Sequence, residues 1–178
     1  MKEYKRIYIL GPQGSGKTLL AKRISKKLKI SSFSLDDIYW KRKYTVKRGE
    51  AEKKKLLSKL LGKHKKWIIE GLSTSFVEGA VKQADLVIWL DLDHKLLSYR
   101  VIKRQLFGKG SLSGLRGLLN EIRDYKNKKG MYKKHRDLLK GNRKYIVLRS
   151  KRDVKKFLDE LQNLTKSNKS PVAIDISS

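Results

Sequence analysis

The strongest constraint on this chain is residues 11–18, which read Gly-Pro-Gln-Gly-Ser-Gly-Lys-Thr. The stretch follows the apolar run at residues 7–10 and precedes a helix-like segment at residues 19–24. Between a strand and a helix, this spacing makes a phosphate cradle, because the glycines let successive N–H groups face one anion and the helix N-terminus attracts negative charge. The stretch therefore predicts a nucleoside triphosphate site. The alternative, a glycine-rich turn with a chance lysine, does not account for the flanking elements.

Short apolar runs alternate along the rest of the chain with longer amphipathic segments. This alternation is typical of a parallel sheet whose two faces are covered by helices. The sequence thus predicts an α/β fold of three layers, the P-loop NTPase fold, with a five-stranded parallel sheet. We expect strands at residues 5–10, 32–35, 67–71, 86–91 and 145–148, and helices at residues 19–28, 50–62, 73–82, 94–106, 118–140 and 151–163.

Composition narrows the classes of ligand and site. The chain has 45 Lys and Arg against 17 Asp and Glu, a net charge of +28, which favours phosphorylated ligands, nucleic acid or anionic surfaces. It has no cysteine, which excludes disulfides and thiolate metal sites. The three histidines lack ligand spacing, so we expect ordinary surface or boundary residues. No run of 18 apolar residues and no signal peptide is present, so we expect a cytoplasmic protein without a membrane partner. We expect it to be a monomer or a homodimer.

Acidic residues follow several of the expected strands. Asp36 and Asp37 follow the second strand, Glu70 closes the third, and Asp91 closes the fourth. Ligands of parallel α/β sheets bind at the carboxyl ends of the strands. Because acids are scarce in this chain, their placement on the rim that carries the phosphate loop indicates a site there.

The sequence resembles the nucleoside monophosphate kinase-like P-loop proteins, and is most similar to the small adenylate kinase-related group called DNA topology modulation proteins. The resemblance covers residues 5–163 as a series of blocks in matching order. Besides the phosphate loop, the blocks are Leu35-Asp36-Asp37-Ile38-Tyr39-Trp40, Trp67-Ile68-Ile69-Glu70-Gly71, Ala84-Asp85-Leu86-Val87-Ile88-Trp89-Leu90-Asp91, the pair Arg100 and Arg104, and Leu148-Arg149-Ser150.

The resemblance implies one P-loop kinase-like domain over residues 1–164, with ATP and Mg²⁺ as cofactors. It implies an acceptor-side helical insert at about residues 38–66 and a basic helical lid at about residues 107–140. Residues 165–178 are expected to form a flexible tail. In the lid, Arg116, Arg123 and Arg136 are candidates for clamping the transferred phosphate, since a guanidinium matches phosphate geometry.

The resemblance also implies roles for single residues. Lys17, Asp36, Asp37, Arg104 and Arg136 would be catalytic. Thr18 and Asp36 would hold the metal, with Glu70 acting through a bound water. One of the two aspartates could instead cap the following helix, and Glu70 could be only a charged strand end. ATP would contact Gly11, Pro12, Gln13, Gly14, Ser15, Gly16, Lys17, Thr18, Arg100, Arg104 and Ser150.

Two departures from adenylate kinases leave the phosphate acceptor open. Their Gly-x-Pro-Arg, whose arginine grips the monophosphate, is replaced here by Gly-Leu-Ser-Thr at residues 71–74. The insert at residues 41–66 also carries 12 Lys and Arg against 2 acids. The favoured hypothesis is an ATP-dependent kinase that phosphorylates a nucleotide, nucleoside or metabolite.

Two other hypotheses remain. One is a nucleic-acid-associated ATPase or polynucleotide end kinase, suggested by the basic stretches at residues 41–66 and 103–144. The other is a regulator that binds nucleotide without turning it over, which the presence of Lys17, Thr18 and Glu70 disfavours.

Overall fold

The computed structural model describes residues 4–42, 45–107, 114–140 and 144–167. Its centre is a five-stranded parallel sheet in the order β2-β5-β1-β6-β7, which confirms the predicted fold class. A two-stranded antiparallel hairpin, β3-β4, lies apart from this sheet. The strands are β1 (Arg6–Leu10), β2 (Ser32–Ser34), β3 (Trp40–Arg42), β4 (Val46–Lys47), β5 (Trp67–Gly71), β6 (Leu86–Leu90) and β7 (Tyr145–Leu148).

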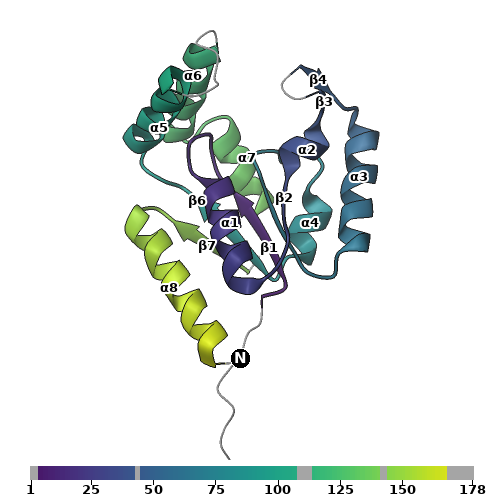
Figure 1. The fold of residues 1–178 in the computed structure, drawn as a ribbon. Helices are drawn as coiled ribbons and strands as arrows, with labels where there is room; N and C mark the ends of the chain where they lie inside the picture. The colour runs from purple at the N-terminus through teal and green to yellow at the C-terminus, as the bar shows by residue number, and fades with distance from the viewer. Residues whose placement is uncertain (1–3, 43–44, 108–113, 141–143, 168–178) are drawn as a thin grey trace, which may run out of the picture.

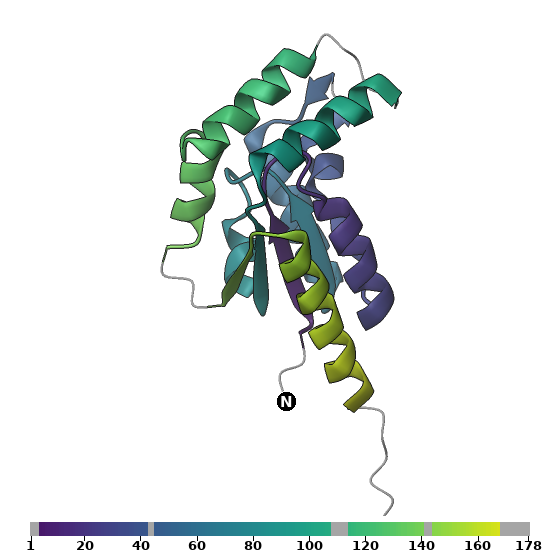
Figure 2. The ribbon, with the colours of Figure 1, turned by 90° about the vertical axis from the view of Figure 1, so that its left-hand side faces the viewer.

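Helices cover both faces of the sheet (Figures 1 and 2). α1 and α8 pack on one face through a core that includes Ile24 and Leu158, and α3, α4 and α7 pack on the other. In the part of the chain that the structure describes, no helix is both long and apolar enough to cross a membrane. The helices are α1 (Lys17–Leu28), α2 (Leu35–Tyr39), α3 (Glu50–Lys63), α4 (Glu78–Gln83), α5 (His94–Phe107), α6 (Leu115–Lys126), α7 (Met131–Leu138) and α8 (Lys151–Ser167).

The central strands are apolar on both faces because both faces are covered. Every residue of β5 and β6 is buried, and only the first residue of β1 is not. In the parallel register, Ile9 pairs with Glu70 and Leu10 pairs with Gly71. The acid that closes β5 is therefore brought level with the last residues before the phosphate loop.

Several predicted boundaries are wrong in instructive ways. The insert after β2 is not wholly helical, because it contains the β3-β4 hairpin before α3. The long helix predicted at residues 118–140 is two helices, since Gly130 adopts φ 51° and ψ −119° between α6 and α7. The helix predicted at residues 73–82 is shorter in the structure, where it is α4 and begins at Glu78. Helix α8 extends to Ser167, past the helix end predicted at residue 163, and the rest of the predicted tail lies outside the described residues.

Gly71 is a position where a side chain has no room. A Cβ atom there would lie 2.6 Å from Leu35 Cβ and 2.7 Å from Leu35 Cδ1, in a fully packed part of the core. We therefore expect Gly71→Ala to destabilise the fold by about 1–3 kcal/mol through overpacking. Gly79→Ala is the control, because a Cβ there meets no atom within 4 Å. Urea unfolding measures the free energy of unfolding of both variants. An equal loss in the two variants would contradict this account.

Candidate functional site

The loop between β1 and α1 has a backbone that only glycine supports at several positions. Gly14 and Gly16 have φ values of 74° and 90°, in the left-handed region. A Cβ at Gly11 would lie 2.7 Å from the carbonyl oxygen of Leu90, and one at Gly14 would lie 2.9 Å from that of Leu97. The loop is therefore packed tightly against β6 and α5. Its geometry agrees with the cradle expected from the motif.

Lys17 is the first residue of α1 and lies at the centre of the site. Its Nζ donates a hydrogen bond of 3.0 Å to the carbonyl oxygen of Pro12. Burial lowers the pKa of Lys17 to about 8, although the carboxylates of Glu70 and Asp36 oppose this shift and Arg104 adds to it. These three partners are close enough to act on the ammonium group. The fold thus brings together Lys17, Asp36, Glu70 and Arg104, four residues that the sequence singled out.

Thr18 and Glu70 form the contact that joins the loop to β5. The Thr18 hydroxyl donates to Glu70 Oε1 at 3.0 Å, and Glu70 is only 6% exposed. A hydroxyl and a carboxylate are the hard oxygen ligands that Mg²⁺ prefers, and Mg²⁺ usually adds phosphate oxygens and waters to one or two protein groups. Among the described residues there is no cluster of three or more His, Cys, Asp or Glu that would form a protein-only metal cage. The pair therefore fits a magnesium ion that is shared with a phosphate ligand.

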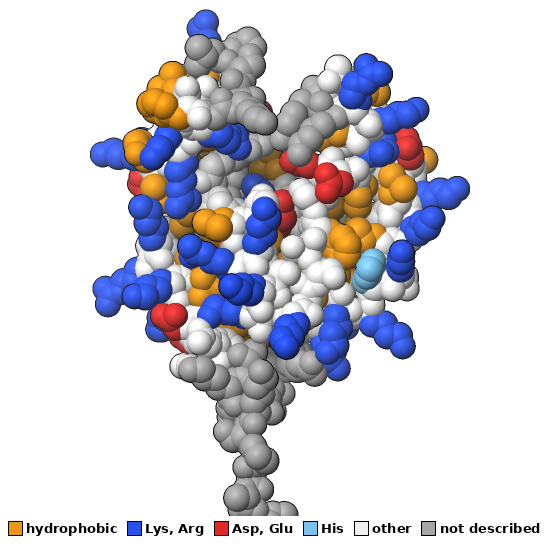
Figure 3. Space-filling model, in the orientation of Figure 1, with side chains coloured by type: hydrophobic (Ala, Val, Ile, Leu, Met, Phe, Trp, Pro, Cys, Tyr) orange, Lys and Arg blue, Asp and Glu red, His pale blue; other side chains and the backbone are white. Residues whose placement is uncertain are grey.

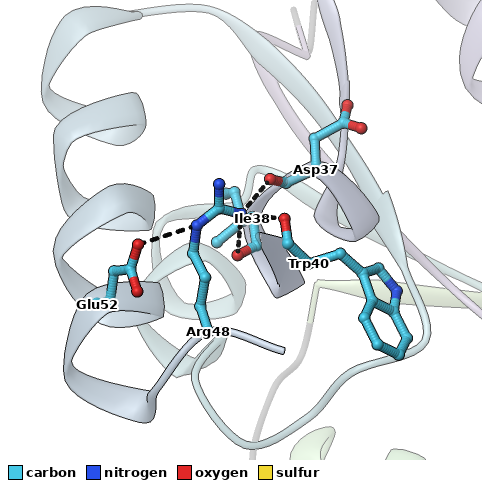
Figure 4. A network of polar contacts seen from close by, with 5 residues as sticks. All are labelled: Asp37, Ile38, Trp40, Arg48 and Glu52. Carbon is cyan, nitrogen blue, oxygen red and sulfur yellow. Dashed lines mark hydrogen bonds and ion pairs between the residues drawn. The ribbon is translucent and has the colours of Figure 1, made fainter. Parts of the chain in front are cut away.

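The two aspartates after β2 lie in the first turn of α2, but neither caps that helix. Ser34 is the cap, since its hydroxyl accepts from the backbone N–H of Asp36. Asp36 is the one that acts on Lys17. Asp37 is exposed, and its side chain points away from Arg48 (Figure 4).

The predicted arginines take different positions. Arg100 donates to the carbonyl oxygens of Gly14 and Ser15 at 3.1 and 3.2 Å, so it supports the loop backbone. Arg136 is exposed on α7, beside Asp137 at 3.7 Å. Arg116 and Arg123 are exposed on α6.

Ser150 is the remaining predicted contact to ATP. Its hydroxyl accepts from the backbone N–H of Asp153, and Asp153 accepts from the backbone N–H of Ser150 in return. This reciprocal pair caps α8. ATP contact by Ser150 stays a prediction.

Arg48 fastens the insert that follows β2 (Figure 4). Its Nη1 donates to the carbonyl oxygens of Asp37, Ile38 and Trp40, and its Nε pairs with Glu52 of α3 at 3.0 Å. One guanidinium therefore ties the end of α2 and the start of β3 to α3.

Lys53 is a second basic residue of the insert that is turned inward. It is 5% exposed, pairs with Glu50 at 2.7 Å and lies 4.4 Å from the centre of the Tyr39 ring. Both inward-facing cations, Arg48 and Lys53, are thus engaged by the protein's own groups.

His135 corrects the expectation that all three histidines are surface or boundary residues, because it is completely buried. Trp89 Nε1 donates to the Tyr125 hydroxyl at 2.6 Å, which lies 2.9 Å from His135 Nδ1, and His135 Nε2 lies 3.1 Å from the Leu72 carbonyl oxygen. Donor and acceptor balance makes Nε2 the protonated nitrogen. Burial, aided by Lys17, lowers the pKa of His135 to about 4, so the ring is neutral at pH 7.

A pocket opens beside the phosphate loop. It has a volume of about 170 Å³, and three segments line it: the loop, the residue after β5, and helices α6 and α7. On the face drawn in Figure 3, a separate hollow lies between the lobe of α5 and α6 and the lobe of α2 and β4, and the acidic side chains beside it lie on the side of α2. The lining residues are Pro12, Gln13, Leu72, Glu121, Ile122, Asp124, Tyr125, Gly130 and Met131.

Sequence reasoning missed the histidine and most of this pocket lining. Tyr125 packs in the core against Trp89 and Tyr132 and also lines the pocket. Glu121 and Asp124 carry no motif; the only signal was their position on α6 next to the inward-facing Ile122 and Tyr125.

The parallel sheet, the phosphate loop and the Thr18–Glu70 pair define a P-loop NTPase with the fold of the nucleoside monophosphate kinase-like proteins. The chain belongs to the ATPase family associated with various cellular activities (AAA), which residues 7–166 match. The prediction of a P-loop family is therefore confirmed.

Two curated relatives match part of the chain. The chain is 35% identical over 112 residues to "Uncharacterized protein YqaC" of Bacillus subtilis (strain 168), covering 62% of this chain and 63% of that protein. It is 31% identical over 113 residues to a cytidylate kinase of Archaeoglobus fulgidus (strain ATCC 49558 / DSM 4304 / JCM 9628 / NBRC 100126 / VC-16), covering 56% and 62%. The matches thus span less than two thirds of either relative.

Solved structures share the fold over nearly the whole chain. Shikimate kinase from Acinetobacter baumannii, in complex with shikimate, superposes with a TM-score of 0.57 at 18% identity, covering 94% of this chain and 96% of that one. Shikimate kinase from Bacteroides thetaiotaomicron gives 0.61 at 17% identity, covering 92% and 99%. At these identities the likeness establishes the fold alone.

The Tyr125 hydroxyl is the middle of the buried network, so its removal leaves Trp89 Nε1 and His135 Nδ1 without a partner. We expect Tyr125→Phe to destabilise the protein by about 1–3 kcal/mol. Tyr132→Phe is the matched control, because Tyr132 packs on the same rings while its hydroxyl makes no hydrogen bond among the described residues. Its effect should stay within about 0.5 kcal/mol. Chemical unfolding measures both, and equal losses would contradict the role of the network.

Proposed function

We propose that this protein is a Mg²⁺-dependent phosphotransferase that moves the γ-phosphoryl group of ATP to a small-molecule acceptor. The observation that carries this proposal is the assembly of Lys17, Thr18, Glu70, Asp36 and Arg104 around one phosphate loop. Phosphoryl transfer needs positioning and charge neutralisation more than covalent chemistry, and this set supplies both. The cytidylate kinase relative and the kinases that share the fold support the reaction class.

The donor side of the reaction follows from the loop. Its N–H groups and the start of α1 would hold the phosphates, and the Lys17 ammonium and Arg104 would neutralise the charge that develops on the transferred group. Arg100 would act through the loop, because it holds the carbonyl groups of Gly14 and Ser15. Asp36 would orient the acceptor hydroxyl.

Thr18 and Glu70 would hold the magnesium ion. When bound, the ion supplies positive charge to the β- and γ-phosphates. Glu70 is buried and already accepts from Thr18, so it holds the hydroxyl group at the carboxyl end of β5. The carboxylate also raises the pKa of Lys17 against the effect of burial, which favours the ammonium form.

The first test removes the lysine. Lys17→Ala should lower ATP turnover by at least about 100-fold, since an electrostatic donor to the transition state is lost. Lys22→Ala, which removes an exposed lysine from the same helix, should leave turnover unchanged. Unaltered turnover in Lys17→Ala, with melting showing a folded protein, would rule out the proposed phosphotransferase. Tight ATP binding without turnover in the wild type would instead indicate a regulator.

The second test concerns the metal. Glu70→Gln keeps an acceptor for the Thr18 hydroxyl but removes the negative charge. We expect the Mg²⁺ concentration that supports half-maximal ATP turnover to rise by about 10–100-fold. Glu78→Gln, an exposed change on α4, is the control. An unchanged Mg²⁺ requirement in Glu70→Gln would mean that Glu70 is only a buried strand end.

Nucleic-acid binding stays a prediction from charge. On the face seen in Figure 3, Lys and Arg side chains are spread over the surface and do not follow a single track. No contact among the described residues singles out a polynucleotide, so it is not proposed as the function. Titration with labelled single-stranded RNA and DNA at rising salt would decide the matter.

A further inference from the structure

The pocket beside the phosphate loop is small and well placed for an acceptor. Pro12 and Gln13 belong to the loop itself, and Leu72 follows the strand that ends in Glu70 and Gly71. Its volume of about 170 Å³ is close to that of a cavity that takes up one benzene-sized ring, about 150 Å³. A single ring or short chain fills this space, and a larger acceptor would have to extend out of its open side.

The charged groups that line the pocket are both acids. Glu121 and Asp124 lie on α6, and none of the lining residues in the described part of the chain is a lysine or arginine. This lining is unexpected in a chain with 45 basic residues and 17 acidic ones. Among the described residues, neither carboxylate makes a hydrogen bond or ion pair. Both side chains are exposed, and partial burial raises the pKa of Glu121.

Neither residues 72–74 nor the two inward-turned cations described in the insert supply the arginine that grips a monophosphate. Residues 72–74, which follow β5, are Leu-Ser-Thr. In the insert, the guanidinium of Arg48 is occupied by three carbonyl groups and Glu52, and the ammonium of Lys53 is occupied by Glu50. An acceptor with its own phosphate would therefore meet two unpaired carboxylates at close range, which is unfavourable.

We propose that this pocket holds the phosphate acceptor, and that the acceptor is a single-ring or short-chain polyhydroxylated molecule with no phosphate or carboxylate group of its own. Glu121 and Asp124 accept hydrogen bonds from its hydroxyl groups, and Gln13 adds a neutral contact from the phosphate loop. This inference rests on the proposed phosphotransferase function and names its substrate class.

The transfer step balances with groups already present. An acceptor hydroxyl oxygen forms a bond to the γ-phosphorus, and the bond from that phosphorus to the β–γ bridging oxygen breaks. ADP leaves with the bridging oxygen. The hydroxyl proton passes through the Asp36 carboxylate to solvent. No oxidant, reductant or further reactant is needed.

The experiment measures binding and transfer separately. Calorimetry with a non-hydrolysable ATP analogue and Mg²⁺ tests a panel of sugars and polyols, sugar acids, nucleosides and nucleoside monophosphates, and the same panel is scored for ATP-dependent phosphorylation. Uncharged polyols or sugars should bind and be phosphorylated. Preferred transfer to a monophosphate, a sugar acid or a nucleoside would overturn the acceptor class while leaving the kinase intact. Failure to bind the ATP analogue, or to transfer to any acceptor, would overturn the proposed function as well.

Two isosteric variants then test the carboxylates. Glu121→Gln and Asp124→Asn should each weaken polyol binding by about 10-fold or more, since a hydrogen bond to a charged group is replaced by one to a neutral group. Asp159→Asn, the same charge change on the exposed side of α8, should have no effect. Binding of the ATP analogue verifies that each variant is folded. Tighter acceptor binding in the two pocket variants would indicate an anionic acceptor, and unchanged binding would place the acceptor elsewhere; either result overturns the proposal.

Discussion

The site depends on the parallel pairing of β1 with β5. In that register Glu70 lies opposite Ile9, one residue before the strand gives way to the phosphate loop. The loop then turns tightly enough for α1 to begin at Lys17, so that the Thr18 hydroxyl reaches the Glu70 carboxylate at 3.0 Å. A shift of one residue in the pairing would turn Glu70 to the opposite face of the sheet and lose this contact.

The large positive charge of the chain is distributed unevenly. Three described cations that face inward bind to groups of the protein itself. Arg48 donates to carbonyl groups, Lys53 pairs with Glu50, and Arg100 donates to the phosphate loop. Lys17 is held between a loop carbonyl group and the carboxylates that oppose its loss of charge. The remaining basic side chains are mostly exposed, whereas the acids Asp36 and Glu70 lie close enough to Lys17 to act on its charge. Net charge alone therefore says little about the acceptor, because the local arrangement around the pocket has the opposite sign.

The sequence correctly predicts those elements that depend on residues close together in the chain. Apolar runs marked four of the five strands of the sheet, all except the short β2, and the phosphate loop was evident from its glycines and Gly16-Lys17-Thr18. The predicted secondary structure was wrong where a few residues interrupt a long helical pattern or form short strands. Gly130 divides the expected helix of residues 118–140, because its backbone angles are accessible only to glycine. The β3-β4 hairpin was missed because its strands are short and lie in a lysine-rich stretch that carries no clear alternation.

The sequence by itself determined the P-loop class, the parallel sheet and the grouping of Lys17, Asp36 and Glu70 at one edge, because each depends on a local motif or on the end of a strand. Only the tertiary structure decided the link between Leu72, Tyr125 and His135 and the acidic pocket beside it. Those groups come from segments more than 50 residues apart, joined through the packing of α6 and α7 over the sheet. No periodicity in the chain records which side chains meet across such a distance, so the lining of the pocket is defined only when the helices are in place.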